Sequence, residues 1–189
     1  MIRIPFLLLL LILSNSCYAS TLQARVRQLT LLPIAYGTNA LNVAGRDVII
    51  TKARLEKENA WSQDQYMVMW KNKGMWQMVE PENGEGVIRA VPHTGEDSIS
   101  QVYFFIPKQK EVQALYLLQV TRKYKENPGE KAIAHFVLSV FTPTEDELGL
   151  TYFTLLETDD SQASYCNAES AAYHELQIPL VGEEFVCGG

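Results

Sequence analysis

Apolar and polar residues alternate with a period of two along most of this sequence, and no feature restricts its fold more. Such alternation is typical of half-buried β-strands, because successive side chains of a strand point to opposite faces. Turn-forming residues separate the alternating runs, as in Asn72-Lys73-Gly74. Strands are predicted near residues 25–32, 47–55, 65–70, 75–80, 86–91, 101–106, 112–124, 132–141 and 151–158. Many short strands at this spacing predict an all-β fold, mainly an antiparallel β-sandwich.

One segment departs from the alternation and predicts a short C-terminal α-helix. Small apolar residues recur at helical spacing from Ala168 to Leu176, and Asn167 just before them is a candidate N-cap. Pro179 follows where this helix should end. No linker, repeat or low-complexity tract divides the chain, so residues 20–189 are predicted to form a single β-sandwich domain.

The first nineteen residues predict a cleavable signal peptide, residues 1–19. Arg3 precedes the apolar residues 4–13, and a small, polar segment ends at Ala19. The apolar run is shorter than the roughly 20 residues that a membrane span needs. The alternative is a lipoprotein acylated at Cys17, although Ser14 stands where an aliphatic residue is preferred. The sequence therefore predicts a periplasmic protein, with no membrane attachment after cleavage.

The charge balance is acidic, with 22 Asp and Glu residues against 16 Lys and Arg residues and a net charge of −6. An acidic surface argues against nucleic acid and anionic lipid as partners. It is compatible with a basic protein partner, such as most lysozymes, and is equally typical of a soluble periplasmic protein.

Two cysteines, Cys166 and Cys187, remain after signal cleavage. In an oxidising compartment such a pair predicts a disulfide. The bond would stabilise the fold by roughly 3 kcal/mol in the loop-entropy treatment. A zinc site is disfavoured, because two thiolates without clustered histidines do not complete one.

Sequence motifs for hydrolytic chemistry are absent. There is no Ser-x-x-Lys and no Gly-x-Ser-x-Gly, and His93, His135 and His174 are isolated. His135 lies within a predicted strand, where a hydrogen-bonded histidine is favoured over a catalytic base. The sequence thus predicts no enzyme and no catalytic residue.

Other candidate ligand groups are the loop carboxylates and the aromatic side chains. Glu96 and Asp97 could bind a cation, as could residues 145–147 and 159–160, but solvated loops are favoured. Tyr66, Trp70 and Trp76 could line a ligand surface, or they could form cross-strand pairs in the core, which we favour. The methionines at 67, 69, 75 and 78 could form an adaptable binding face or a second buried side.

Two stretches carry a resemblance to a known family. The first is Lys52-Ala53-Arg54-Leu55-Glu56-Lys57-Glu58-Asn59-Ala60-Trp61, followed by residues 66–70 and Trp76-Gln77-Met78-Val79-Glu80-Pro81. The second comprises Arg122-Lys123-Tyr124-Lys125-Glu126, residues 132–141, Leu150-Thr151-Tyr152-Phe153, Ser164-Tyr165-Cys166-Asn167 and Glu175-Leu176. This pattern resembles the carbapenem intrinsic resistance (CarG-like) periplasmic proteins, which have an Arg-x-x-Asn-x-Asn-Ala-like segment early and a Tyr-Cys-Asp/Asn helix start late.

The resemblance implies a β-sandwich with short terminal helices, a homodimer, and a fold similar to periplasmic inhibitors of invertebrate-type lysozyme. Family members protect a carbapenem producer from its own antibiotic by a mechanism not known to be hydrolysis. A divalent-cation site has been associated with the family, and no other cofactor is expected.

The sequence departs from the family pattern at two places, which affect the expected dimer and cation site more than the fold. Lys57 stands where the first asparagine of the early segment is expected. The family pairs its late cysteine with one in mid-chain, which residues 95–102 lack here, and this leaves Cys187 for Cys166 in the mature chain.

The leading hypothesis is a non-enzymatic periplasmic protein that protects the cell from a β-lactam, by binding the drug or by shielding a cell-wall enzyme that is its target. The alternative is a periplasmic inhibitor of a lysozyme or another effector, with Ile34-Ala35-Tyr36-Gly37-Thr38 as a candidate inhibitory loop. A hydrolase of unfamiliar type is a third possibility and would need clustered histidines or carboxylates in a cleft. The sequence assigns no residue to a ligand or a metal.

Overall fold

A computed structural model describes residues 21–56, 62–81, 86–91, 99–108, 113–124, 129–143 and 151–180. The predicted signal peptide, Cys187 and the loop carboxylates at 96–97 and 145–147 lie outside these residues. In chain order the elements are α1 (Thr21–Val26), β1 (Leu29–Leu32), β2 (Gly37–Val43), β3 (Arg46–Leu55), β4 (Gln63–Asn72), β5 (Met75–Pro81), β6 (Ile88–Ala90), β7 (Ser100–Pro107), β8 (Leu115–Arg122), β9 (Ala132–Phe141), β10 (Thr151–Tyr165) and α2 (Ala168–Leu176).

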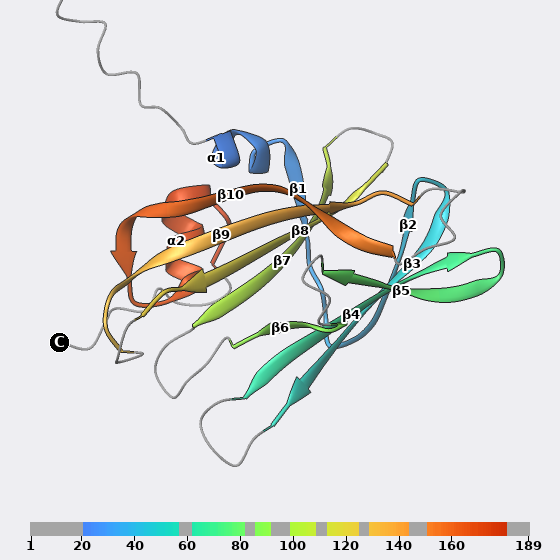
Figure 1. The fold of residues 1–189 in the computed structure, drawn as a ribbon, viewed down its shortest axis with the longest axis horizontal. Helices are drawn as coiled ribbons and strands as arrows, with labels where there is room; N and C mark the ends of the chain where they lie inside the picture. The colour runs from blue at the N-terminus through green and yellow to red at the C-terminus, as the bar shows by residue number, and fades with distance from the viewer. Residues whose placement is uncertain are drawn as a thin grey trace, which may run out of the picture.

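The strands form one continuous sheet rather than the two sheets of the predicted antiparallel sandwich. Their order is β1-β7-β8-β9-β10-β5-β4-β3-β2, and β6 pairs with β4. β10 holds the two parts together, because its first residues pair parallel with β5 and the rest pairs antiparallel with β9. The mainly β fold is therefore confirmed, but the sheet is mixed and strongly curled, like half of a barrel (Figure 1).

The curl of the sheet follows from its connectivity. β1 and β2 are the two ends of the strand order, yet only residues 33–36 separate them in the chain. Four extended residues span at most about 14 Å. The two edges of the sheet must therefore approach each other, and the connection between β1 and β2 lies where they meet.

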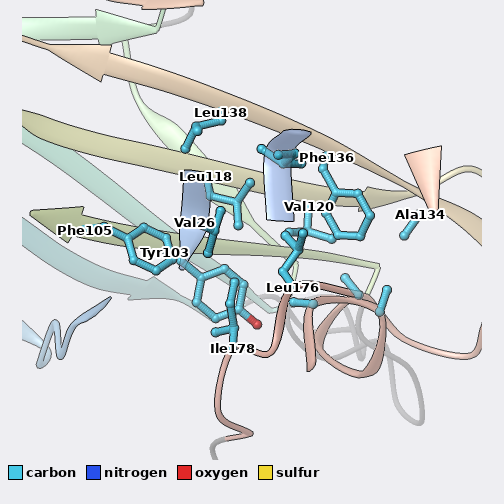
Figure 2. Close-up of a cluster of buried hydrophobic side chains, with 14 of the residues drawn as sticks. Val26, Tyr103, Phe105, Leu118, Val120, Ala134, Phe136, Leu138, Leu176 and Ile178 are labelled. Atoms are coloured by element: carbon cyan, nitrogen blue, oxygen red, sulfur yellow. The ribbon is translucent and has the colours of Figure 1, made fainter. Parts of the chain in front are cut away.

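Strands β7, β8 and β9 are buried on both faces. On one face, their side chains pack with Leu22 and Val26 of α1 and with the apolar side of α2. Figure 2 shows this cluster, with Leu176 and Ile178 lying against Tyr103 and Val120. Two-sided burial explains the nearly continuous apolar sequence of these strands, such as Val102 to Ile106.

The opposite face of β7–β9 packs against the inner face of the curled sheet. This second core contains Val48, Ile50 and Val68, together with larger aromatic side chains. Phe141 of β9 makes edge contacts with Trp70 of β4, at 5.8 Å between ring centroids, and with Phe153 of β10, at 6.0 Å. The aromatic residues thus join strands from both parts of the sheet.

The C-terminal helix α2 was predicted from the sequence, whereas the N-terminal helix α1 was not. Asn167 is the N-cap of α2, since its side-chain oxygen accepts a hydrogen bond from the backbone nitrogen of Ser170 at 2.6 Å. The strand predicted for residues 25–32 is wrong in its first part, where Leu22 and Val26, four residues apart, are buried on one side of α1. Among the described residues no helix is both long and apolar enough to cross a membrane.

Candidate functional site

A cavity of about 470 Å³ opens where the two edges of the sheet meet. Its walls come from the end of β1, the connection to β2, and strands β3, β4 and β7, and Glu169 of α2 lies at its border. The lining residues are Leu31, Leu32, Pro33, Ile34, Ala35, Tyr36, Lys52, Asp64, Tyr66, Gln101, Val102, Tyr103, Phe104 and Glu169. Most of this wall is apolar, with a few polar groups, which is the usual composition of a small-molecule site.

An ion pair between neighbouring strands forms the polar centre of the cavity. Lys52 of β3 pairs opposite Tyr66 of β4, and its Nζ lies 3.0 Å from Oδ2 of Asp64. The hydroxyl of Tyr36 donates a hydrogen bond to Oδ1 of Asp64 at 2.8 Å. The Asp64 side chain is 6% exposed and that of Lys52 is 18% exposed. Both carboxylate oxygens of Asp64 are thus satisfied, as the burial of a charged group requires.

Two tyrosine rings surround the ammonium group of Lys52. The Nζ atom lies 4.4 Å from the centroid of the Tyr36 ring and 5.4 Å from that of Tyr66. These are cation–π distances, at which an ammonium group is attracted to the face of an aromatic ring. The ammonium is therefore held in a fixed position by Asp64 and by two aromatic faces.

Tyrosines in and around the cavity are kept in their neutral form. Burial, and secondarily the charge of Asp64, raises the pKa of Tyr66. Burial, and then the charge of Glu169, raises the pKa of Tyr103. For Tyr36, burial and the hydrogen bond to Asp64 raise the pKa of the hydroxyl. These hydroxyls therefore stay protonated at neutral pH, and that of Tyr36 donates its hydrogen bond to Asp64.

The pKa of Tyr66 predicts a loss of stability in alkali. The folded-state pKa lies above the ordinary value of 10.0, so the neutral hydroxyl is favoured by folding and the stabilisation is complete below that pH. Above about pH 10, the free energy of unfolding should fall by about 1.4 kcal/mol per pH unit for this residue. Urea denaturation across this pH range measures the slope. The Tyr66→Phe variant should show a shallower decline, and an unchanged slope would contradict the assignment.

The aromatic residues and methionines that the sequence offered as a ligand surface do not all lie at the cavity. Tyr66 and Trp70 are both buried in the second core, as we favoured, and Tyr66 also lines the cavity. Trp76 is 44% exposed on β5. The methionine set does not form a second buried side, because Met75 and Met78 are exposed and Met67 and Met69 are half-buried on the outward side of β4.

The structure also shows the surroundings of His135 and His174 and of the loop proposed to be inhibitory. His135 contacts Oδ1 of Asp160 through Nδ1 at 2.6 Å, as expected for a hydrogen-bonded strand histidine, and Lys123 contacts the same oxygen at 3.1 Å. His174 is exposed on α2 and stacks on Tyr165. Ile34, Ala35 and Tyr36 belong to the cavity wall.

The structure tests the predictions about a metal site and a disulfide only in part. Among the described residues no three His, Cys, Asp or Glu side chains lie close enough to hold a metal ion. Cys166 is buried just before α2, and its predicted partner Cys187 is outside the described residues, so their disulfide stays a prediction. His93 lies outside them as well.

The sequence did not identify Lys52, Asp64, Gln101 or Glu169 as residues of a ligand site. A signal for Asp64 exists, because it occupies the buried phase of β4 together with Tyr66 and Val68. A carboxylate on the inward side of a strand needs a partner there. Its partner Lys52 belongs to another strand, so only the strand register identifies it.

Comparisons with known proteins give one likeness. A scan against protein families and a search of curated protein sequences found no match. Among solved structures, the chain is similar to the crystal structure of CarG, with a TM-score of 0.64 and 16% sequence identity. The similarity covers 77% of this chain and 95% of CarG. The resemblance seen in the sequence is thereby confirmed for the fold.

Proposed function

We propose that this chain is an exported, non-enzymatic protein that protects a cell from a β-lactam antibiotic, by binding the drug or by shielding its target. The fold likeness extends over 95% of CarG, whose fold is therefore nearly complete in this chain. Carbapenem resistance is the function that the family resemblance implies. The observation that carries the proposal is the combination of this fold with a cavity of suitable size and polarity.

The cavity favours binding over turnover. Its volume of about 470 Å³ lies within the roughly 300–1,000 Å³ of small-molecule sites. A hydrolytic site would need a nucleophile beside a base, and the described residues that line this cavity include no serine, cysteine or histidine. Three of its polar groups, Tyr36, Lys52 and Asp64, are held in place by one another, which suits recognition.

Export, the disulfide and a homodimer complete the proposal. Residues 1–19 would direct the chain to the periplasm, where Cys166 and Cys187 would become linked. The bond would fix residues after α2 to the junction between β10 and α2. A homodimer is proposed from the family resemblance alone.

The experiment is a comparison of minimum inhibitory concentrations of a simple carbapenem for a sensitive Gram-negative host. One strain exports the chain, one exports the Cys166→Ser/Cys187→Ser variant, and one carries an empty vector. We expect the chain to raise the inhibitory concentration and the variant to lose this protection. The absence of protection, with folded chain recovered from the periplasm, would contradict the proposal.

A second candidate function is inhibition of a lysozyme or another cell-wall effector. Tyr36 favours it, because this residue is 56% exposed on the connection between β1 and β2. Rigid, exposed tyrosines are frequent anchors at protein interfaces. The test measures lysis of bacterial cell walls by purified invertebrate-type and chicken-type lysozymes with the chain and with Tyr36→Ala. Inhibition that disappears in the variant would support this function.

A further inference from the structure

Strand β7 has an open stretch along the edge that faces the cavity. β1 pairs with residues 104–107 of β7 and ends at Leu32. Toward the other end of β7, the backbone nitrogen of Ser100 donates a hydrogen bond to the carbonyl of Val91 at 3.2 Å. Among the described residues no strand pairs with residues 101–103 on this side, and these three residues line the cavity.

The alternation of hydrogen bonds along β7 shows which residue faces the open edge. Residues of an antiparallel strand direct their N–H and C=O groups alternately to one neighbouring strand and to the other. The nitrogen of Arg122 in β8 donates to the carbonyl of Ile99, so the odd-numbered residues of β7 bond to β8. The nitrogen of Lys108 donates to the carbonyl of Gln28 just before β1, so the even-numbered residues face the other side. Both backbone groups of Val102 therefore point to the open edge, where no backbone group of another described residue bonds to them.

The connection from β1 to β2 leaves the position beside Val102 open. If β1 continued in the same register, Ile34 would lie opposite Val102, but the pairing stops before Pro33. The side chain of Asn39 in β2 donates a hydrogen bond to the carbonyl of Ala35 at 2.8 Å and accepts one from its nitrogen at 3.0 Å. Both backbone groups of Ala35 are thus bonded to β2, which holds this connection in a course that does not extend β1.

The open edge has the chemistry of a site for an extended peptide. One ligand residue could accept a hydrogen bond from the N–H of Val102 and donate one to its C=O, as a neighbouring strand does. Its side chain would lie on the same face as that of Val102. Tyr66 and Phe104 pack on this face in the second core, at 5.6 Å between ring centroids, so an apolar ligand side chain fits there. Because Leu32 and Val91 occupy the two ends, the open stretch has room for about three residues at the rise of a strand.

We propose that the cavity binds a short, extended peptide with an apolar central residue, which adds to the edge of β7 at Val102. The cavity volume of about 470 Å³ is in the range of sites for such small ligands. A long strand of a protein partner would collide with Leu32 and Val91. The inference goes beyond the proposed function, because it names another class of ligand and holds whether or not the chain protects cells from a β-lactam.

The test is an NMR titration of the isotope-labelled mature chain with two probes. One is the blocked tripeptide acetyl-Ala-Val-Ala-amide, and the other is the same peptide with a methyl group on the valine nitrogen. Methylation removes the donor to the Val102 carbonyl, so it should weaken binding about fivefold or more. In the free chain, the Val102 N–H should exchange with solvent faster than those of Gln101 and Phe104, and the unmethylated peptide should slow this exchange.

Two variants separate the backbone of Val102 from its side chain. Val102→Pro removes the N–H that faces the cavity and leaves the β7–β8 hydrogen bonds in place, as proline does at a strand edge. It should bind the unmethylated tripeptide about fivefold more weakly or worse. The matched control Val102→Ala keeps the N–H and should remain sensitive to methylation of the peptide. Circular dichroism and thermal unfolding show which variants fold, and the two probes decide the question on the original chain even if Val102→Pro does not.

Several outcomes would overturn the inference. They are no binding of the unmethylated tripeptide, equal binding of the two probes, and a Val102 N–H that exchanges as slowly in the free chain as that of Phe104. A longer peptide with the same centre should bind no more tightly than the tripeptide, because Leu32 and Val91 limit the site. Markedly tighter binding of the longer peptide would mean that the edge accepts a strand of a protein partner, and the assignment to short peptides would be wrong.

Discussion

Phe153→Ala should lower the free energy of unfolding by about 3–5 kcal/mol, the usual cost of removing a large aromatic side chain from a core. Phe153 is 0% exposed and packs edge-on against Phe141. It lies opposite Pro81 in the short parallel pairing of β10 with β5. Because this pairing joins the two parts of the sheet, the loss of its buried side chain should weaken the whole fold. Urea denaturation followed by circular dichroism measures the change.

The matched control is Tyr152→Ala, one residue earlier in the same strand. Tyr152 is 49% exposed on the opposite side of β10, so we expect its replacement to cost less than about 1 kcal/mol. Similar losses for the two variants would mean that the start of β10 does not bury Phe153 between the two parts of the sheet. That result would contradict the continuous, curled sheet.

Local patterns in the sequence predicted the elements that local chemistry determines. The boundaries of β9, 132–141, agree with the prediction because apolar residues on both faces produce a run that only His135 and Ser139 interrupt. α2 was predicted from its N-cap Asn167 and its small apolar residues. In both cases the signal lies within about ten neighbouring residues, so no tertiary information was needed.

The elements that the sequence did not predict depend on distant contacts. β2 was not predicted, because it forms an edge of the sheet and most of its residues remain exposed or half-buried. The second half of β10 was missed because polar residues such as Asp159, Asp160 and Ser161 interrupt its apolar pattern. Register shifts interrupt its pairing with β9 at Leu155/Glu157 and at Asp160/Ser164. Such irregularities bend a strand, and the period-two pattern does not extend across them.

The candidate site could not be predicted for a similar reason. Lys52 and Asp64 meet through the register of β3 and β4, and Glu169 reaches the cavity from a helix more than one hundred residues later. Lys52 and Glu169 look like ordinary surface charges in the sequence, and the inward phase of Asp64 does not identify its partners. Only the closing of the sheet edges by residues 33–36 brings the three side chains to one cavity.

Arg122→Met should also lower the free energy of unfolding strongly, by about 2–6 kcal/mol. Arg122 is 2% exposed at the end of β8. Its guanidinium donates hydrogen bonds to the backbone carbonyl of Cys166, just before α2, and to that of Glu130 at 2.6 Å. Methionine fills much of the same volume but leaves both carbonyls without this donor, and each unsatisfied buried group costs about 1–3 kcal/mol. Urea denaturation of the two proteins measures the difference.

Lys123→Met is the matched control, because it removes the charge of the next residue from the surface. The Lys123 side chain is 51% exposed and pairs with Asp160, an ion pair that should contribute less than about 1 kcal/mol. If Arg122→Met were no more destabilising than Lys123→Met, the buried guanidinium would not hold the β10–α2 junction. A large difference would mean that the buried guanidinium stabilises the junction between β10 and α2, the helix that carries Glu169.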